Sequence, residues 1–332
     1  MRIAIAGLGR IGDQHYCTYK TIKSSVPEIS IDAVCDKDPL LLSKYTAQGI
    51  RAYTDYYEML RCESSAIDMV DVCVPTFLHK DYSIKALDAG YAVVCEKPMA
   101  LNEADCRLMA DASQKNGKLL MIAHPMRFFK AYEVIKEYMD NNVLGALTSA
   151  FFNRCDGRPA QYDRWFYKDH LSGGINLDLL IHDVDAVQWL MDGLPDAVSA
   201  AAHRFIYPAV SGDDAIYDSI SANLLYGNRY INLYCDWTVE MNMHMKRFFR
   251  VNFENGYLIY DESIAPVLTA MSDGICVKSI DLAGCDPYAE ELIYFIKCLK
   301  NDEPVDRCPP ENSLLSVRMC NMIRAGIITA SS

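Results

Sequence analysis

The stretch "RIAIAGLGRIG", residues 2–12, decides the fold of this chain. Its first five residues form a short apolar run that is typical of a buried strand. Three glycines follow at the spacing GxGxxG, and residues 10–24 continue with a helical pattern. The stretch therefore predicts a strand, a tight glycine loop and a helix, which together open a βαβ unit.

The same alternation continues over the first third of the chain. Strand-like runs fall at residues 29–36, 69–76, 91–98 and 118–125, and helical runs fall at residues 39–49, 79–90 and 101–117. Alternating elements of these lengths predict right-handed crossovers and a parallel, doubly wound sheet. We expect an N-terminal α/β domain of the Rossmann type over residues 1–123.

In a strand–loop–helix unit of this kind, each glycine has a separate task. Gly7 permits the tight turn, Gly9 lets a pyrophosphate approach the backbone, and Gly12 lets the helix pack closely on the strand. Asp36 ends the second strand-like run, where a carboxylate binds the ribose hydroxyls of NAD and repels the 2′-phosphate of NADP. The motif predicts a dinucleotide and favours NAD, while the neighbouring Lys37 leaves NADP open.

The pattern changes after Ala123. A helical run at residues 129–142 is followed by β-like runs at residues 147–155, 197–207, 218–227, 230–238, 246–261 and 274–282. Short turns such as "YGNR" and "ENG" favour antiparallel pairing. Residues 287–302 and 311–327 read as two terminal helices. We expect a second α/β domain over residues 124–332.

Composition limits the partners of the protein. The 332 residues carry 32 basic and 44 acidic side chains, a formal net charge of −12, with the acidic residues scattered along the chain. This balance disfavours nucleic acid and anionic membranes. No stretch reaches the length of a membrane span and the N-terminal apolar run is too short for a secretory signal, so we expect a cytoplasmic protein.

The thirteen cysteines fit this expectation. Their number is odd, no two stand at CxxC spacing, and several lie inside apolar runs, as Cys73 and Cys95 do. Such thiols behave as small buried side chains in a reducing compartment. The pattern predicts neither a disulfide framework nor a cysteine metal site.

Two further motifs carry ionisable groups. "EKP", residues 96–98, ends a strand-like run, so Glu96 and Lys97 should lie at the carboxyl edge of the sheet, where ligands bind in open α/β folds. "SGGINLDLLIHDVDAV", residues 172–187, places Asp178, His182 and Asp185 on one face of a predicted helix. Three ligands on one helix face cannot readily surround an ion, so we predict no metal there.

The chain resembles the Gfo/Idh/MocA oxidoreductases, the family of glucose-fructose oxidoreductase and inositol dehydrogenase. "GLGRIG", "PTFLH", "EKP" and "GGINLDLLIHDVD" stand in the family's order and at similar separations. The resemblance covers the Rossmann half and the helix around Asp178; the rest agrees only in general pattern. It implies a C-terminal domain with a large, open, mostly antiparallel sheet and a nicotinamide between the domains.

The resemblance also implies the site. Lys97, Asp178 and His182 are expected to meet at the substrate as catalytic residues. The expected cofactor-binding residues are Gly7, Gly9, Arg10, Ile11, Gly12, Asp36, Lys37, Pro75, Thr76, His79, Glu96 and Lys97. Many relatives have Pro-Asn where this chain has Pro75-Thr76, a mild departure that keeps a polar side chain.

Oxidation of a secondary alcohol removes a hydride and a proton, so a proton acceptor must stand beside the carbinol oxygen. His182 fits because imidazole titrates near neutral pH. Lys97 would stabilise the developing alkoxide or act as the base itself, and Asp178 would pair with Lys97 or orient a substrate hydroxyl. We expect Asp185 to support the helix face and Asp183 to face solvent.

Substrate contacts are predicted from two segments. Arg127 follows the Rossmann half and is expected either to touch substrate or cofactor or to form a structural salt bridge. The loop at residues 154–171 mixes aromatic and charged side chains, which suits a polyhydroxylated ring, and Arg164 and Trp165 are its candidate substrate residues. Its basic residues leave a sugar phosphate or nucleotide sugar open, and packing on a neighbouring subunit is an alternative role.

These observations predict an NAD-dependent oxidoreductase acting on a secondary hydroxyl or ketone of a sugar, sugar derivative or inositol. The alternatives are a glycosidase that uses bound NAD for transient oxidation and a non-catalytic dinucleotide-binding sensor. The resemblance implies an open sheet with one uncovered face, and such a sheet predicts a homodimer or homotetramer.

Overall fold

The computed structural model describes residues 1–64, 66–157, 164–204, 216–237, 245–265 and 267–328. It divides the chain into two compact units, each built from two segments. The Rossmann unit comprises Met1–Pro125 and Asp286–Leu314, and the sheet unit comprises Met126–Cys285 and Leu315–Ser332. The first boundary lies two residues after the expected Ala123, whereas the return of residues 286–314 to the Rossmann unit was not expected.

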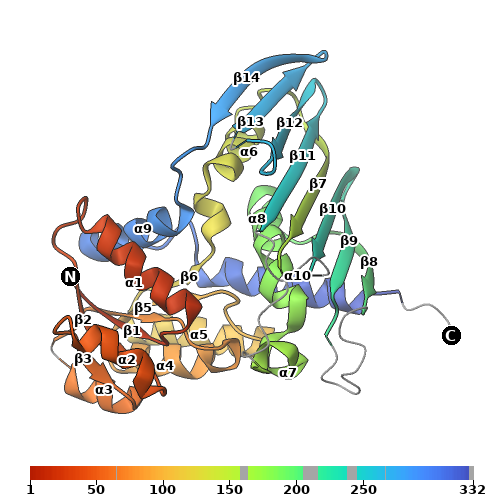
Figure 1. Ribbon diagram of the computed structural model, residues 1–332. Coiled ribbons are helices and arrows are strands. Elements are labelled where there is room, and N and C mark those ends of the chain that lie inside the picture. The colour runs from red at the N-terminus through yellow and green to blue at the C-terminus, as the bar shows by residue number, and fades with distance from the viewer. Residues whose placement is uncertain (65, 158–163, 205–215, 238–244, 266, 329–332) are drawn as a thin grey trace. The chain divides into compact units, whose positions relative to one another are not determined.

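The Rossmann unit is built on a six-stranded parallel sheet in the order β3-β2-β1-β4-β5-β6 (Figure 1). Its strands are β1 (Arg2–Ala6), β2 (Ser30–Cys35), β3 (Arg51–Tyr53), β4 (Met69–Val72), β5 (Ala92–Glu96) and β6 (Leu120–Ala123). Every residue of β4, β5 and β6 is buried, as expected for a parallel sheet that is covered on both faces. The predicted doubly wound fold is confirmed.

Helices alternate with these strands. They are α1 (Arg10–Ile22), α2 (Pro39–Thr46), α3 (Tyr56–Cys62), α4 (His79–Asp88) and α5 (Glu103–Asn116), with the short 3-10 helix η1 (Thr76–Leu78) before α4. The later helix α9 (Pro287–Asn301) packs against α1. Asp286 caps α9 by accepting the backbone N–H groups of Tyr288 and Ala289, and Pro287 occupies its first position.

The sheet unit contains eight strands in the order β14-β13-β12-β11-β7-β10-β9-β8. They are β7 (Leu147–Cys155), β8 (Ala197–His203), β9 (Ser219–Tyr226), β10 (Arg229–Asp236), β11 (Lys246–Phe253), β12 (Gly256–Asp261), β13 (Val267–Ser272) and β14 (Ile275–Asp281). Neighbouring strands are antiparallel except β7 and β10, which pair in parallel. The expected open, mostly antiparallel sheet is confirmed.

One face of this sheet is covered by helices. The unit's helices are α6 (Lys130–Asp140), α7 (Asp169–Ser172), the π-helix η4 (Asn176–Leu180), α8 (Ile181–Met191) and α10 (Pro310–Ala325), which begins in the Rossmann unit, with 3-10 helices η2 (Pro125–Phe128) and η3 (Arg164–Tyr167). Tyr132 of α6 packs on Phe152 of β7 and Phe249 of β11, with ring centroids 5.9 Å and 5.3 Å apart.

Burial alternates along the central strands, which distinguishes the two faces of the sheet. In β9, Ile220, Ala222 and Leu224 are buried. On the other face, Phe151, Leu225 and Tyr230 are more than a third exposed. The core of the unit therefore lies between the sheet and its helices, and the opposite face keeps apolar side chains near solvent.

Several elements differ from the sequence prediction. The three-residue strand β3 and the seven-residue helix α3 were not predicted, because elements this short carry little periodicity. Strand β13 was also missed: its run begins directly after Pro266 and is only half buried. Strand β8 ends at His203, and residues 205–207 of the run predicted there lie outside the described residues.

Candidate active site

The glycine loop joins β1 to α1 in the geometry that a phosphate site requires. Gly7 has φ +91°, and a Cβ there would lie 2.6 Å from the carbonyl oxygen of Cys73. A Cβ on Gly12 would lie 1.9 Å from the carbonyl oxygen of Gly7. A Cβ on Gly9, which caps α1, would meet nothing within 4 Å. Gly7 and Gly12 are thus fixed by packing, while Gly9 leaves open space at the helix N-terminus, where phosphates bind.

Asp36 lies against this loop. Its Oδ2 accepts the backbone N–H of Leu8 at 2.7 Å, and its Oδ1 accepts that of Asp38 at 2.9 Å. The carboxylate is half-buried at the end of β2, which is the place where a ribose-binding acid stands in this fold. Lys37 and Arg10 are exposed, and Ile11 is half-buried beside Gly12. The residues present therefore fit a dinucleotide with a free 2′-hydroxyl.

The loops after β4 and β5 are joined through His79. Its Nδ1 lies 2.7 Å from the carbonyl oxygen of Pro98, and its Nε2 lies 2.8 Å from that of Val74. The ring is buried, and this burial lowers the pKa of His79. Pro75 is half-buried and Thr76 is buried at the start of η1. The position of His79 favours a part in holding these two loops together.

Glu96 and Lys97 stand at the carboxyl end of β5. Glu96 is buried; one carboxylate oxygen lies 3.0 Å from Nε2 of His15, and the other accepts the backbone N–H of Lys97 at 3.1 Å. Burial alone would raise the pKa of Glu96, but the contact with His15 holds it below its ordinary value. Lys97 is half-buried, and the Lys97–Pro98 peptide is cis. The Glu96 carboxylate thus turns into the protein.

Asp178 and His182 occupy a helical segment of changing pitch in the sheet unit. The π-helix η4 contains Asp178 and leads directly into α8, whose second residue is His182. Gly173 precedes it with φ +75°, and a Cβ there would lie 2.4 Å from the Leu177 side chain. Single π-turns inside α-helices are frequent at functional sites. The structure therefore places Asp178 and His182 one turn apart, with Asp178 half-buried and His182 buried.

Asp185 follows His182 by three residues in α8 and has partners of its own. Asp185 is fully buried and accepts two hydrogen bonds from Arg127, both at 2.8 Å. Ser316 of α10 donates to the same carboxylate at 2.8 Å, and Arg127 also donates to Gln188 at 2.9 Å. Of the two roles expected for Arg127, these contacts favour the structural ion pair, with Asp185 supporting the helix.

Asp183 was expected to face solvent, and that prediction was wrong. It is 2% exposed and pairs with the buried Arg154 through contacts of 2.8 Å and 2.9 Å. The Tyr132 hydroxyl donates to the same carboxylate at 2.6 Å. A buried arginine on β7 was not visible in the periodicity of α8, because its partner lies 29 residues away in the sequence.

The loop predicted to form a substrate wall is described in part. Trp165 is half-buried in η3, with its ring centroid 4.4 Å from that of Phe166, and Phe166 lies 6.4 Å from Trp237. Arg164 begins η3. Residues 158–163 of the predicted loop lie outside the described residues.

The predicted residues thus fall into two sets. The Rossmann unit carries the glycine loop, Asp36 and Lys97, and the sheet unit carries Asp178 and His182. Sequence reasoning missed a third group, His15, Asp71 and Cys73, whose ligand atoms lie within 4.8 Å of one another in the Rossmann unit. The signal was present: Asp71 interrupts the apolar run of β4, and His15 stands three residues after the last loop glycine.

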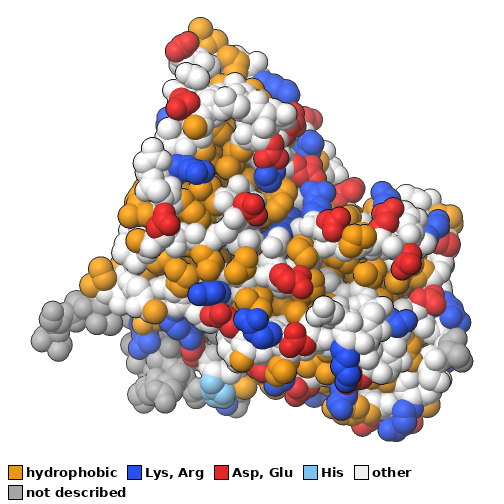
Figure 2. Space-filling view, turned by 180° about the vertical axis from the view of Figure 1, so that it is seen from behind, with side chains coloured by type: hydrophobic (Ala, Val, Ile, Leu, Met, Phe, Trp, Pro, Cys, Tyr) orange, Lys and Arg blue, Asp and Glu red, His pale blue; other side chains and the backbone are white. Residues whose placement is uncertain are grey.

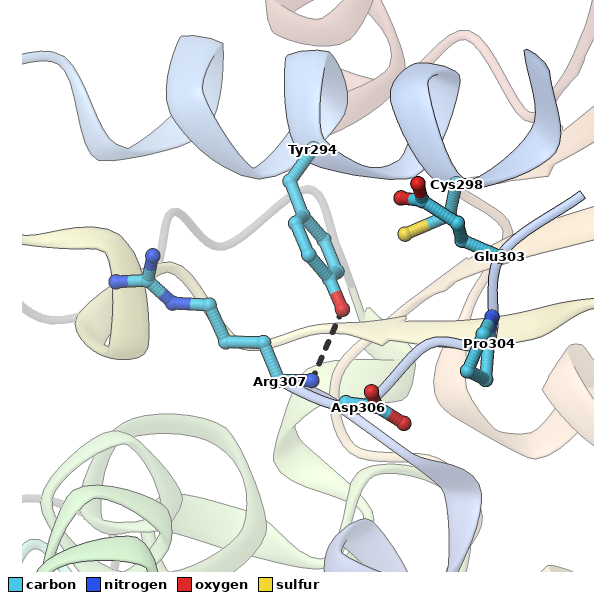
Figure 3. Close-up of a pocket in the computed structure, with 6 residues that line it drawn as sticks. All are labelled: Tyr294, Cys298, Glu303, Pro304, Asp306 and Arg307. Atoms are coloured by element: carbon cyan, nitrogen blue, oxygen red, sulfur yellow. Dashed lines mark hydrogen bonds between the residues drawn. The ribbon is translucent and has the colours of Figure 1, made fainter. Parts of the chain in front are cut away.

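A hollow on the Rossmann unit holds none of these residues. It lies between α9 and the segment that follows it, and Figure 3 shows its lining. The Tyr294 hydroxyl accepts the backbone N–H of Arg307 at 2.9 Å, with Glu303 and Asp306 nearby. The hollow has no element of the dinucleotide loop and is not the candidate active site.

The surface agrees with the charge balance. Figure 2 shows acidic and basic side chains interspersed over the face that it presents, without a large field of one sign among the residues described there. No helix in the described ranges is long and apolar enough to cross a bilayer.

The fold and the glycine loop define a two-unit, dinucleotide-binding oxidoreductase class. Residues 1–124 match the family described as an oxidoreductase family with an NAD-binding Rossmann fold, and residues 132–259 match the GFO/IDH/MocA C-terminal domain. The chain belongs to the Gfo/Idh/MocA family, as the sequence motifs indicated.

Named relatives and solved structures agree with this assignment. D-glucoside 3-dehydrogenase of Escherichia coli is 31% identical over 212 residues, 62% of this chain and 58% of that protein. Myo-inositol 2-dehydrogenase of Thermotoga maritima is 32% identical over 193 residues, 58% of this chain and 55% of that protein. The chain therefore matches little more than half the length of these relatives.

The structural similarity to solved proteins extends over nearly the whole chain. A levoglucosan dehydrogenase solved in complex with NADH superposes with a TM-score of 0.86 at 16% identity, covering 98% of this chain and 96% of that structure. At this identity the match establishes the fold.

Proposed function

We propose that this protein is an NAD-dependent dehydrogenase that transfers a hydride between nicotinamide and a secondary hydroxyl, or the matching ketone, of a sugar, sugar derivative or inositol. The observation that carries the proposal is the position of Lys97. It stands half-buried at the carboxyl edge of the same sheet that carries the glycine loop, where ligands bind in open α/β folds.

The residues that would hold the cofactor are the glycine loop and Asp36. The open space at Gly9 admits a pyrophosphate, and the Asp36 carboxylate offers acceptors to ribose hydroxyls and repels a 2′-phosphate. When bound, NAD supplies the hydride acceptor for alcohol oxidation. The family's description as NAD-binding supports this choice over NADP.

We assign the proton chemistry to the three predicted catalytic residues. His182 accepts the hydroxyl proton as the alcohol becomes a ketone, and returns it in the reverse direction. The Lys97 ammonium donates a hydrogen bond to the same oxygen and stabilises its negative charge. Asp178, one turn before His182, orients a substrate hydroxyl or pairs with Lys97.

The proposed substrate class rests on the character of the loop and on the relatives. Trp165 and Phe166 provide aromatic faces for the C–H surface of a ring, and the charged residues nearby suit its hydroxyls. Two relatives are named for dehydrogenation of a glucoside and of an inositol. These names favour a dehydrogenase over the glycosidase that the sequence left as an alternative.

The test is NADH formation, followed by absorbance, with NAD or NADP and a panel of inositols, hexoses, glycosides and nucleotide sugars. We expect turnover with NAD for one member of the panel. Lys97→Met and His182→Gln should lower kcat by about 10²–10⁴-fold while NADH binding persists. His203→Gln, at the exposed end of β8, is the matched histidine control and should keep full activity.

Two outcomes would contradict the proposal. Tight NADH binding without net NADH formation from any substrate would point to a binding protein or to redox-neutral chemistry. Unchanged turnover in both variants would remove Lys97 and His182 from the reaction.

We also infer that the protein assembles as a homodimer or homotetramer through the open face of the large sheet. Phe151, Leu225 and Tyr230 are 36%, 43% and 43% exposed on three neighbouring strands, and Tyr230 pairs with Leu225 across β9 and β10. Exposed apolar side chains gathered on a sheet favour burial against another surface. Light scattering after gel filtration tests this; a monomer at micromolar concentration would contradict it.

A cytoplasmic location is proposed on the state of the cysteines. All thirteen lie in the described residues as free thiols, eight of them buried. Such a set is compatible with a reducing compartment. Fractionation of the native host with a cytoplasmic marker enzyme tests this location.

A further inference from the structure

A buried chain of charged groups runs from the centre of the Rossmann unit to Lys97. Nδ1 of His15, on α1, lies 2.8 Å from the carboxylate of Asp71 on β4. Nε2 of the same ring lies 3.0 Å from the carboxylate of Glu96 at the end of β5. His15 and Asp71 are fully buried and Glu96 is 6% exposed, so water does not screen these contacts.

This arrangement favours a protonated His15. When ionised, both carboxylates can only accept hydrogen bonds, so a ring that satisfies both must carry a hydrogen on each nitrogen. A neutral imidazole has only one N–H, which leaves one of the two contacts without a donor. Burial is the strongest influence and lowers the pKa of His15, but the contacts with Asp71 and Cys73 together outweigh it, and the pKa stands well above its ordinary value.

The other groups around the ring are consistent with one cation and two anions. The Cys73 thiol lies 3.3 Å from Asp71 and 3.5 Å from His15, and burial raises its pKa, which keeps it neutral. Tyr19, on the same helix as His15, has its pKa raised by burial and by Asp71. Glu291 of α9 is fully buried, and burial together with the charge of Glu96 raises its pKa, so it is uncharged as well.

The chain ends at the proposed catalytic lysine. Glu96 uses one carboxylate oxygen for His15 and the other for the backbone N–H of Lys97, at 3.1 Å. Any shift of the Glu96 side chain therefore moves a partner of the Lys97 backbone. His15 thus holds the Glu96 carboxylate in place, and this carboxylate holds the backbone of Lys97.

We propose that His15 is a positioning residue: as a permanent buried cation it holds Glu96 against the backbone of Lys97 and so sets the position of the Lys97 side chain in the reaction. This inference rests on the proposed dehydrogenase function for its kinetic consequence. The structural part of the inference, that a charged His15 is coupled to Lys97, does not depend on that function.

A metal ion is the competing explanation for the same residues. His15, Asp71 and Cys73 offer three ligand atoms within 4.8 Å of one another, a set that zinc uses. A metal on Nδ1 would require the ring to be neutral and Cys73 to be a thiolate, whereas the contacts of both nitrogens with carboxylates favour the imidazolium. The measurements below separate the two.

The first measurement needs no substrate. In protein labelled with ¹³C at histidine, the His15 resonance is identified by its loss in His15→Gln. We expect it to keep imidazolium shifts from about pH 5 to pH 8, the range in which an unperturbed imidazole changes charge. A neutral His15 at pH 7 would overturn the proposal, and so would one zinc per chain that is lost in His15→Gln.

The second measurement examines the coupling to Lys97, again without turnover. Lysines are dimethylated with ¹³C-formaldehyde, and the Lys97 signal is assigned with Lys97→Arg. We expect His15→Gln and Glu96→Gln each to change the chemical shift of this signal at pH 7, while His203→Gln leaves it unchanged. An unchanged Lys97 signal in folded His15→Gln protein would overturn the proposal.

Kinetics complete the test once a substrate is known. His15→Gln should lower kcat about ten- to hundredfold, the effect of losing a charge-assisted hydrogen bond, and leave KM for NAD within about threefold. His15→Lys, which restores a cation, should recover part of kcat. A loss of thermal stability with kcat unchanged would reduce His15 to a structural role. If no substrate is turned over, the two NMR measurements still decide the inference.

Discussion

The guanidinium of Arg127 and the carboxylate of Asp185 face each other in the sheet unit with two parallel hydrogen bonds of 2.8 Å, and both side chains are essentially buried. The pair connects the segment before α6 to the middle of α8, the helix that carries His182. Removing one partner of such a pair leaves a buried charge without compensation, which costs more than removing both.

Arg127→Met should therefore lower the free energy of unfolding of the sheet unit by ~3–5 kcal/mol. The three tryptophans, Trp165, Trp189 and Trp237, all belong to this unit, so their fluorescence in urea reports its unfolding. The double variant Arg127→Met/Asp185→Leu is the control and should recover much of the loss. Equal destabilisation in the single and double variants would contradict this account.

Alanine substitutions at Gly12 and Gly9 should affect the Tm differently. Gly12→Ala places a Cβ against the Gly7 carbonyl and should both lower the Tm and abolish measurable NADH binding, because the loop must rearrange. Gly9→Ala meets no protein atom, so it should keep the Tm and weaken NADH binding only by occupying space at the phosphates. Calorimetric titration and thermal scans measure both; equal Tm losses would contradict the assignment.

Asp36 should control the choice between the two dinucleotides. Asp36→Ser removes acceptors for the ribose hydroxyls and the repulsion of a 2′-phosphate, so we expect the ratio of NADH to NADPH affinity to fall by about 100-fold. Asp38→Ser, which keeps a side-chain cap on α2, is the matched control and should leave the ratio unchanged. An unaltered ratio in Asp36→Ser would remove this residue from the cofactor site.

Glu291 should make the protein less stable as the pH rises, which is the opposite of the usual effect of a carboxyl group. Its pKa is raised in the folded protein, so the carboxyl is neutral when folded and ionises on unfolding. The contribution of Glu291 to the free energy of unfolding is fully present below its pKa in the unfolded chain. This contribution is lost as the pH rises from that pKa to the higher pKa in the folded protein. Glu291→Gln should therefore raise the Tm at pH 8 by about 2–4 °C, with a smaller gain near pH 4.5.

The neighbouring Glu290 provides the control for that measurement. It is exposed in the first turn of α9, where a carboxylate stabilises the helix N-terminus, so Glu290→Gln should lower the Tm slightly at pH 8. Differential scanning calorimetry of both variants across pH is the test. A lower Tm in Glu291→Gln at pH 8 would show that the carboxyl is ionised in the folded protein.

The sequence contained most of the fold because the periodic elements are long. The parallel strands read as continuous apolar runs, and the antiparallel pairs β9–β10 and β11–β12 were marked by short turns. The parallel pairing of β7 with β10 and the return of α9 to α1 depend on contacts between distant segments, which leave no local pattern.

The candidate site was predictable to a similar extent. Gly7 and Gly12 follow from backbone geometry and packing that only glycine satisfies, while Gly9 and Asp36 follow from what a dinucleotide requires at this loop. The burial of Asp183 did not follow, because it is decided by the buried Arg154 elsewhere in the chain, and the partner of Asp185, Arg127, is likewise distant in the sequence. The π-turn at Asn176–Leu180 also departs from the regular 3.6-residue repeat that the sequence suggests.

The division of each unit into two segments has a consequence for synthesis. Residues 1–125 leave the ribosome with all six strands of their sheet, yet α9, which covers α1 beside the His15 network, emerges only about 160 residues later. A nascent chain therefore holds an unfinished Rossmann sheet while the whole antiparallel sheet is being made. A fragment cut at Pro125 would stay in that unfinished condition, and a self-standing version of this half would need residues 286–314 attached through a new linker.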